Sequence, residues 1–151
     1  MREEILWRVN TDLLSVPPLV SRLIRKKLVR PIRGDSEMEL KISHFEIMRI
    51  LKEEGTLHPA NIGEKLCIAK AQMTHLVDKL VELSFVKREL GENDRRTLNI
   101  TLTANGYKLL EEQDSLFTSA IRDNMAALSD GELETLSNSL RILRSTLLKL
   151  Q

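Results

Sequence analysis

The feature that most constrains the fold is a charged cluster at residues 91–96, which reads Gly-Glu-Asn-Asp-Arg-Arg. Residues 86–90 before it and 97–102 after it both alternate apolar and polar side chains. Alternation with a period of two on both sides of a Gly/Asn/Asp cluster predicts a β-hairpin with a charged tip.

Two adjacent arginines, Arg95 and Arg96, are expected at that tip. A guanidinium group suits a phosphate or a narrow minor groove of DNA. Asp94 lies two residues from Arg96, so on an extended arm both side chains project to the same side, where the carboxylate can hold the guanidinium in place. The alternative for an isolated hairpin is a solvated, charged turn, and the sequence in front of it decides between the two.

The segment before the hairpin has the pattern of two helices joined by a tight turn. Pro59 suits the first position of a short helix, residues 67–69 interrupt it, and residues 70–83 form a longer helix. The longer helix turns four apolar residues inward (Met73, Leu76, Val77 and Leu80) and a polar set outward (Lys70, Ala71, Gln72, Thr74, His75, Asp78 and Lys79). A helix-turn-helix followed directly by a basic-tipped hairpin predicts a winged helix-turn-helix.

The flanking segments are predicted to be helical as well. Apolar spacing indicates an N-terminal helix that Pro17 and Pro18 divide into two pieces, with one long kinked helix as the alternative. Ser43 and Glu46 have the spacing of a capping box, with Ile42 and Ile47 as its hydrophobic staple, and Gly55 is the expected stop of that helix. Thr103 is the expected cap of a further helix whose apolar spacing continues to Leu128.

The last helix is predicted from a second capping box, Ser129 with Glu132, and a leucine stripe. Its spacing of three and four residues is typical of a coiled-coil seam (Leu133, Leu136, Leu140, Leu143, Leu147 and Leu150). An ordinary core stripe is the alternative. Because Ile142 and Leu148 widen the apolar face of a helix in a small protein, we expect self-association through this seam.

Composition sets the remaining limits. With 151 residues, 42% of them hydrophobic, the chain can form one domain or one domain with an oligomerisation extension. The net charge of +1 gives no nucleic-acid signature by itself, but residues 1–34 hold eight basic and three acidic side chains. A single cysteine fits a cytoplasmic protein, and no apolar run approaches the roughly 18 residues of a membrane span.

From about Ser43 to Gly106 the sequence resembles the MarR family of transcription regulators. The resemblance is carried by Ile-Gly-Glu-Lys-Leu at 62–66, Met-Thr-His-Leu-Val-Asp-Lys-Leu at 73–80, Phe-Val-Lys-Arg at 85–88, Asn-Asp-Arg-Arg at 93–96 and Leu-Thr-x-x-Gly at 102–106. It implies a dimer whose second motif helix enters the major groove, with Arg96 in the minor groove and Asp94 holding it. Three positions depart from the family pattern: Cys67 and Ser84 replace glycines, and Ala69 replaces a Ser or Thr cap.

We therefore predict a mainly α fold with a small β-hairpin wing, a winged helix-turn-helix at residues 35–102, and helical dimerisation segments at 1–34 and 103–151. The predicted function is a homodimeric, sequence-specific DNA-binding regulator, most consistent with a repressor of a palindromic operator. Phosphate contacts are assigned to Thr74, Lys79 and basic residues between 22 and 33, and base readout to Gln72, His75 and Lys70.

Other classes of function are weighed against this one. His44, His58 and His75 lie on different predicted elements without metal-ligand spacing, and the chain has no Gly-rich phosphate loop, so we predict neither an enzyme nor a metal or cofactor. A helical interaction adaptor without DNA binding is a further alternative. The resemblance also implies a small aromatic or carboxylic effector, but the sequence identifies no pocket residues. A redox-responsive regulator is an alternative through Cys67, although this cysteine lies in the motif turn rather than near the N-terminus, where oxidation-sensing family members carry theirs.

Overall fold

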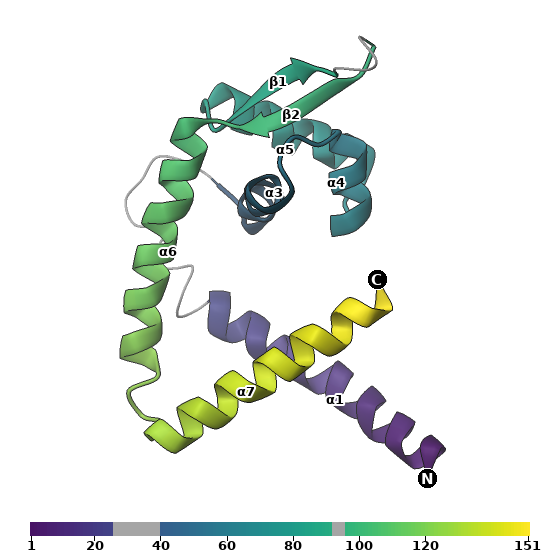
Figure 1. Ribbon diagram of the computed structural model, residues 1–151, viewed down its shortest axis with the longest axis vertical. Coiled ribbons are helices and arrows are strands. Elements are labelled where there is room, and N and C mark those ends of the chain that lie inside the picture. Colours follow the sequence, from purple (N-terminus) through teal and green to yellow (C-terminus); the bar gives the residue numbers. More distant parts are fainter. Residues whose placement is uncertain (26–39, 92–95) are drawn as a thin grey trace. The chain divides into compact units, whose positions relative to one another are not determined.

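The computed structural model describes residues 1–25, 40–91 and 96–151, and the chain divides into two compact units (Figure 1). One unit contains Asp35–Ser115, and the other contains Met1–Gly34 and Leu116–Gln151. The described chain is mainly helical with one two-stranded antiparallel sheet, as predicted. No helix among the described residues is long and apolar enough to cross a membrane.

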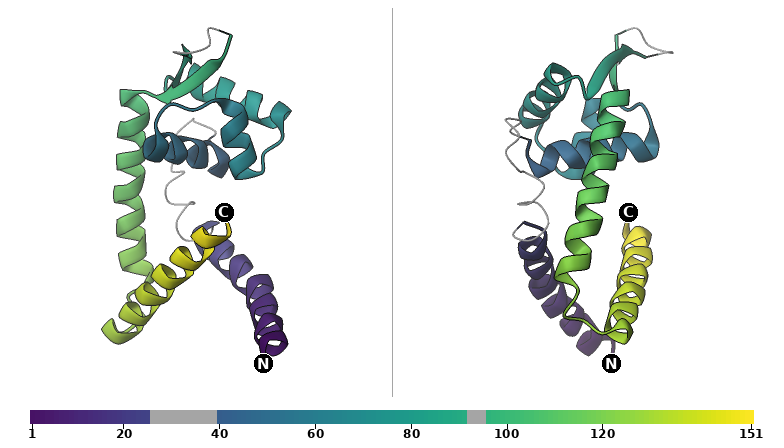
Figure 2. Two further views of the ribbon diagram at one scale, coloured as in Figure 1. Left: turned by 45° about the vertical axis from the view of Figure 1, so that its right-hand side comes forward. Right: turned by 90° about the vertical axis from the view of Figure 1, so that its left-hand side faces the viewer.

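The Asp35–Ser115 unit holds the core of the described chain. It contains α3 (Ile42–Glu54), α4 (Pro59–Leu66), α5 (Lys70–Glu82), β1 (Val86–Leu90), β2 (Leu98–Leu102) and the first half of α6 (Ala104–Asn124). One apolar cluster joins all of these elements, and its fully buried members include Ile47, Met48, Ile62, Leu80, Ile100 and Leu110. Figure 2 shows α6 beginning directly after the hairpin, where the hydroxyl of Thr103 accepts from the N–H of Gly106 at 3.1 Å as predicted.

The start of α3 differs from the prediction. The N-cap is Lys41 rather than Ser43, because the ring Nδ1 of His44 accepts the N–H of Lys41 at 2.8 Å and satisfies the helix entrance two residues earlier. Leu40, which precedes the cap, is buried in the core, so the chain enters α3 with an apolar anchor two residues before the predicted staple residue Ile42. The predicted stop at Gly55 is confirmed, with φ at +83°.

The hairpin follows the predicted alternation. The register pairs Val86 with Leu102, Arg88 with Ile100, and Leu90 with Leu98. Leu57 pairs with Ile100 through two backbone hydrogen bonds, of 2.9 and 3.1 Å, so β2 has a partner on each side.

The unit formed by the chain ends consists of α1 (Arg2–Leu23), the second half of α6, α7 (Asp130–Leu147) and the short 3-10 helix η2 (Leu148–Leu150). The prediction of two N-terminal pieces is wrong, because α1 continues through Pro17 and Pro18. The φ of proline is itself helical, so the cost of about 3 kcal/mol arises from lost hydrogen bonds and a clash with the preceding turn rather than from an impossible backbone. The predicted end of the second piece, residues 31–34, lies outside the described residues.

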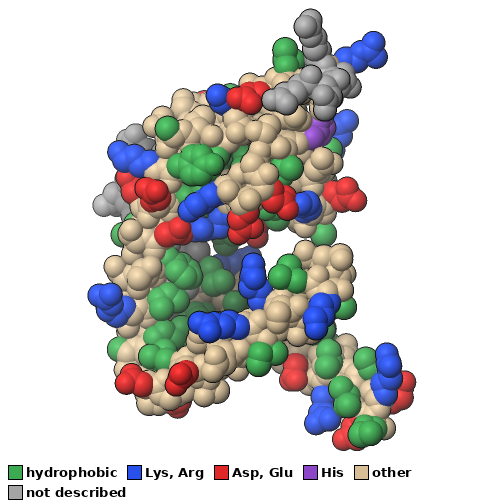
Figure 3. All heavy atoms as spheres, in the orientation of Figure 1, with side chains coloured by type: hydrophobic (Ala, Val, Ile, Leu, Met, Phe, Trp, Pro, Cys, Tyr) green, Lys and Arg blue, Asp and Glu red, His purple; other side chains and the backbone are tan. Residues whose placement is uncertain are grey.

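No residue of α1 or α7 is buried. Figure 3 shows apolar side chains among charged ones on the surface of both helices. The capping box of α7 forms as predicted: Ser129 N–H donates to Glu132 Oε2 at 2.8 Å, and Glu132 N–H donates to Ser129 Oγ at 3.3 Å. Because this box requires a non-helical residue at Ser129, α6 ends at Asn124, one turn before the predicted Leu128.

Candidate nucleic-acid interface

Helix α5 is fixed by its apolar side and presents its polar side outward. The four residues predicted to face inward, Met73, Leu76, Val77 and Leu80, are all buried in the core. The N–H of Ile68 donates to the carbonyl of Gly63 at 2.8 Å, which closes the turn from α4 to α5. The two helices approach closely at Gly63, where an added Cβ would lie 2.9 Å from Met73 Cγ.

The turn before α5 has the backbone geometry expected from its residue pattern. Cys67 has φ +54° in the left-handed region, and Ser84, after α5, has φ +63°. Both positions are those where the family pattern has glycine, so each side chain adds strain. Ala69 caps α5 without a side-chain hydrogen bond. The first backbone N–H groups of a helix have no intrahelical acceptor, and they carry the positive end of the helix dipole.

The outward residues assigned to DNA contact lie along α5. Lys70, Gln72, Thr74 and His75 are exposed, whereas Lys79 is half-buried. The hydroxyl of Thr74 donates to the carbonyl of Lys70 at 3.1 Å, which leaves its oxygen lone pairs as the free hydrogen-bonding groups. Lys79 lies 3.6 Å from Glu82 one turn further along the helix. α5 thus presents cationic and hydrogen-bonding groups along one face.

The wing supplies the second part of the interface. Arg96 is exposed next to β2, and the N–H of Gly91 donates to the carbonyl of Thr97 at 2.8 Å below the tip. Asp94 and Arg95, the other two tip residues in the prediction, lie outside the described residues. The expected hold of Asp94 on Arg96 therefore stays a prediction.

An ion pair joins the wing to α5. Arg88 Nη2 on β1 donates to Asp78 Oδ1 on α5, and the two side chains are 38% and 55% exposed, respectively. The sequence placed Asp78 on the outward face of the longer helix and Arg88 in the Phe-Val-Lys-Arg motif without connecting them. The contact joins residues ten positions apart across a strained turn, so spacing alone gives no signal for it.

His44 is the buried polar side chain among the described residues, at 4% exposure. Burial lowers its pKa from the ordinary value of 6.5, and the positive charges of Lys41 and then of Lys79 on α5 act in the same direction, while the hydrogen bond from the Lys41 backbone opposes them. Burial and the two lysine charges therefore favour the neutral ring. No cluster of three His, Cys, Asp or Glu side chains in the described parts of the chain could hold a metal ion.

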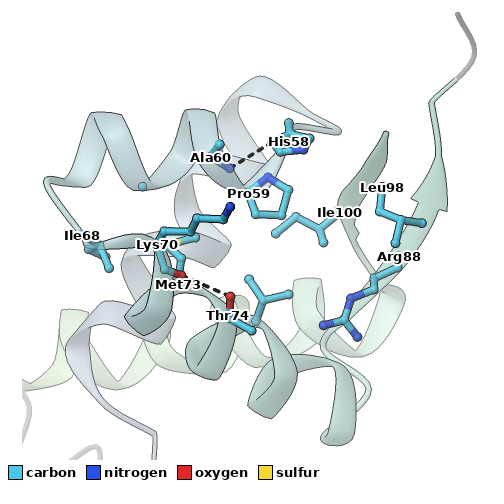
Figure 4. A pocket seen from close by; sticks show the side chains of 12 residues that line it. His58, Pro59, Ala60, Ile68, Lys70, Met73, Thr74, Arg88, Leu98 and Ile100 are labelled. Atoms are coloured by element: carbon cyan, nitrogen blue, oxygen red, sulfur yellow. Dashed lines mark hydrogen bonds between the residues drawn. The ribbon is translucent and has the colours of Figure 1, made fainter. Parts of the chain in front are cut away.

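A pocket of about 260 Å³ lies between α4, α5 and the hairpin (Figure 4). Its wall is largely apolar, formed by residues such as Pro59, Ile68, Met73 and Ile100. Three nitrogen-bearing side chains also line it: His58, Lys70 and Arg88, from the start of α4, the start of α5 and β1.

The sequence identified no pocket residues: it assigned Lys70 to DNA contact and gave His58 and Arg88 no role in a site. His58 is the N-cap of α4, and its Nδ1 accepts from the N–H of Ala60 at 3.1 Å. A histidine directly before Pro59 was the available signal, although imidazole is not among the common capping groups. Arg88 is brought to the pocket by the hairpin, which the sequence predicted without its register or its side-chain contacts.

Comparison with known proteins supports the same interpretation. Residues 40–98 match the model of the MarR family. The chain is 27% identical over 129 residues to YpoP, an uncharacterised HTH-type transcriptional regulator of Bacillus subtilis, covering 85% of this chain and 92% of the relative. It is 28% identical over 137 residues to the HTH-type transcriptional regulator PecS of Dickeya dadantii, covering 83% and 81%.

Solved structures share the fold. A MarR transcriptional regulator from Methanosarcina mazei matches with a TM-score of 0.71 and 22% identity, over 90% of this chain and 98% of that one. The reduced form of MarR from Escherichia coli matches with a TM-score of 0.71 and 20% identity, over 84% and 94%. Together with the helix-turn-helix and the wing, these likenesses identify residues 40–98 as a winged helix-turn-helix of the MarR type and support a DNA-binding transcriptional regulator.

Proposed function

We propose that the protein is a homodimeric repressor that binds a palindromic operator and is released from it by a small aromatic or carboxylic effector. Repression, dimerisation and release are the parts of this proposal that go beyond the family. The site of action follows from the DNA target, which in a bacterial or archaeal cell lies in the cytoplasm.

The observation that carries the proposal is the absence of burial in α1 and α7, two helices with continuous apolar stripes. On α7, Leu133, Leu140 and Leu143 are 36%, 52% and 42% exposed. On α1, apolar residues also follow three- and four-residue spacing across the prolines (Leu6, Val9, Leu13, Val16, Val20 and Leu23). Apolar stripes of this length favour burial against a partner, and a second copy offers the same seams in return.

Within the DNA-binding unit, contacts divide by position on α5. Lys70, Gln72 and His75 lie in its first two turns, where a recognition helix meets base edges. Thr74 and Lys79 are assigned to phosphates, and Arg96 to the minor groove. A two-fold dimer then requires two half-sites about 10 base pairs apart, or a multiple of that spacing.

The direct test is fluorescence anisotropy on DNA from upstream of the protein's own coding sequence, measured against scrambled DNA at several salt concentrations. We expect specific binding with a stoichiometry of two chains per site. Gln72→Ala should reduce affinity for the specific site more than for scrambled DNA, whereas Lys79→Ala should weaken both and flatten the salt dependence. Equal binding of both DNAs by the wild-type protein, or none, would favour the adaptor alternative.

The pocket supports the effector part of the proposal. Its largely apolar wall fits an aromatic ring, and Lys70 and Arg88 offer cationic groups to a carboxylate. Lys70 also belongs to the proposed DNA contacts, so a ligand that pairs with it competes with DNA for the same charge. This pocket lies within the DNA-binding unit.

A thermal-shift screen with benzoate-type acids and matched neutral amides tests this part. Acids that bind should raise the melting temperature and lower DNA affinity, and Arg88→Met should weaken their binding while Arg49→Met, on α3 outside the pocket, should not. If acids and amides raised the melting temperature equally, the cationic groups of Lys70 and Arg88 would not contribute to ligand recognition.

A further inference from the structure

We infer that Asp78 and Arg88 form a positioning pair that fixes the wing relative to α5, so that the two elements meet DNA in one fixed relation. The inference rests on the proposed DNA binding and assigns a role to two residues outside the contact set. Neither is required to touch DNA: the pair acts through Arg96.

Burial anchors the hairpin at its base and, through Ile100, at the middle of β2, but not nearer the tip. Val86 and Leu102, the pair nearest the helices, are 2% and 7% exposed. Further out, Leu90 and Leu98 are 63% and 49% exposed, so burial there contributes little to holding the arms in place. A hairpin that is held only in the half nearer its base moves most at its tip, next to which Arg96 lies.

The Asp78–Arg88 contact lies between these two zones. Arg88 pairs in register with Ile100, midway along the strands, and its guanidinium bonds to α5. Nearer the base, the N–H of Phe85 donates to the carbonyl of Leu80 at 2.9 Å. On β1, the ion pair is therefore a second point of attachment to α5, further toward the tip, whereas β2 is held at the same level by the burial of Ile100 and its backbone hydrogen bonds to Leu57.

Because Asp78 is negatively charged, a positioning role predicts the opposite effect on DNA affinity from simple electrostatic repulsion. A carboxylate on the face of α5 that meets DNA repels phosphates, so removing it should increase affinity if long-range charge alone decides. If Asp78 holds Arg88 and through it the wing, removing it should instead weaken specific binding. Because both side chains are partly exposed, losing their ion pair should lower the equilibrium constant of folding by at most about fivefold. The variants should therefore stay folded.

The first experiment compares Asp78→Asn, Asp78→Glu and the control Glu82→Gln on operator and scrambled DNA. Glu82 lies one turn further along α5 and pairs with Lys79 rather than with the hairpin. Glu82→Gln should raise affinity for both DNAs by the same factor. Asp78→Asn should lower operator affinity about tenfold or less while scrambled DNA binds as well as before or better, and Asp78→Glu, which keeps the carboxylate, should restore most of the loss.

The second experiment is a double-mutant cycle between Arg88→Met and Arg96→Ala. If Arg88 acts by placing Arg96, Arg88→Met should weaken operator binding severalfold in the wild-type background and have almost no effect once Arg96 is alanine. Additive losses would assign Arg88 a direct DNA contact and overturn the inference, as would tighter operator binding by Asp78→Asn. If the wild-type protein showed no preference for operator DNA, the proposed function would fail instead, which keeps the two outcomes distinguishable.

Discussion

The hydroxyl of Thr103 donates to the carbonyl of Ser84 at 2.6 Å and accepts from the N–H of Gly106 at 3.1 Å. One side chain thus joins the turn after α5 to the first turn of α6. Its backbone N–H also donates to the carbonyl of Phe85 at 3.0 Å, which closes the base of the hairpin. Thr103 therefore caps α6 and also connects the end of the recognition helix to the base of the wing.

Thr103→Ala should lower the free energy of unfolding by about 1–2 kcal/mol, because it removes the cap and leaves the carbonyl of Ser84 without its hydroxyl partner. Thr103→Ser keeps the hydroxyl and should recover most of the difference. Urea denaturation of both variants measures this. Equal loss in the serine variant would assign the effect to the methyl group.

Glycine is required at position 106 because α6 and the hairpin approach each other closely there. A Cβ there would overlap the carbonyl oxygen of Phe85 and lie 2.6 Å from Leu102 Cδ1, so Gly106→Ala must push α6 away from the hairpin. We expect a loss of about 1–3 kcal/mol. The matched control is Gly131→Ala in α7, where no atom lies within 4 Å and the better helix propensity of alanine should be neutral or stabilising. Thermal melts should show a lower melting temperature for Gly106→Ala and an unchanged or higher melting temperature for Gly131→Ala.

His44 should make stability depend on pH. Its pKa is lowered in the folded state, by burial first and then by Lys41 and Lys79, so below about pH 6.5 the unfolded chain binds more protons than the folded one. Stability should be fully present above that pH and decline as the pH falls toward the lower folded value. His75→Gln, on the exposed face of α5, should keep this dependence. A His44→Phe variant whose stability still falls over the same range would assign the effect to other groups.

Leu140→Glu should disrupt the proposed dimer. Leu140 is 52% exposed in the single chain, so a glutamate there is tolerated by the monomer but becomes an unpaired charge at an apolar seam between subunits. Sedimentation should show monomers or aggregates, and operator affinity should fall by orders of magnitude, since one unit alone contacts half a site. Glu134→Gln, on the same helix but outside the leucine stripe, is the control. A folded, dimeric and DNA-competent Leu140→Glu protein would contradict the proposal.

Cys67→Gly should stabilise the protein by about 0.5–1 kcal/mol by relieving the left-handed backbone at φ +54°. Cys67→Ala removes the thiol and keeps the strain, so it isolates any redox role. If peroxide releases the wild-type protein from DNA and fails to release Cys67→Ala, the redox alternative holds. If peroxide releases both proteins from DNA, or neither of them, regulation does not depend on this cysteine.

The sequence by itself determined the order and the type of the elements in the DNA-binding unit. The alternation around residues 91–96, Pro59 at the start of α4 and the inward stripe of α5 are local signals that depend on backbone preference and on periodicity. They were confirmed because neighbouring residues are enough to specify them. The cap at Ser129 belongs to the same class.

Contacts between distant residues were decided only by the tertiary structure. Asp78 with Arg88, Thr103 with Ser84, and Leu57 with Ile100 depend on how α5, the hairpin and α6 pack, and no spacing along the chain encodes that packing. Two local predictions were wrong for other reasons. The ring of His44 provided a cap for α3 that serine-based rules did not anticipate. The helix α1 continues through Pro17 and Pro18 because the φ of proline is itself helical, so the two prolines cost hydrogen bonds and a clash without making a helical backbone impossible.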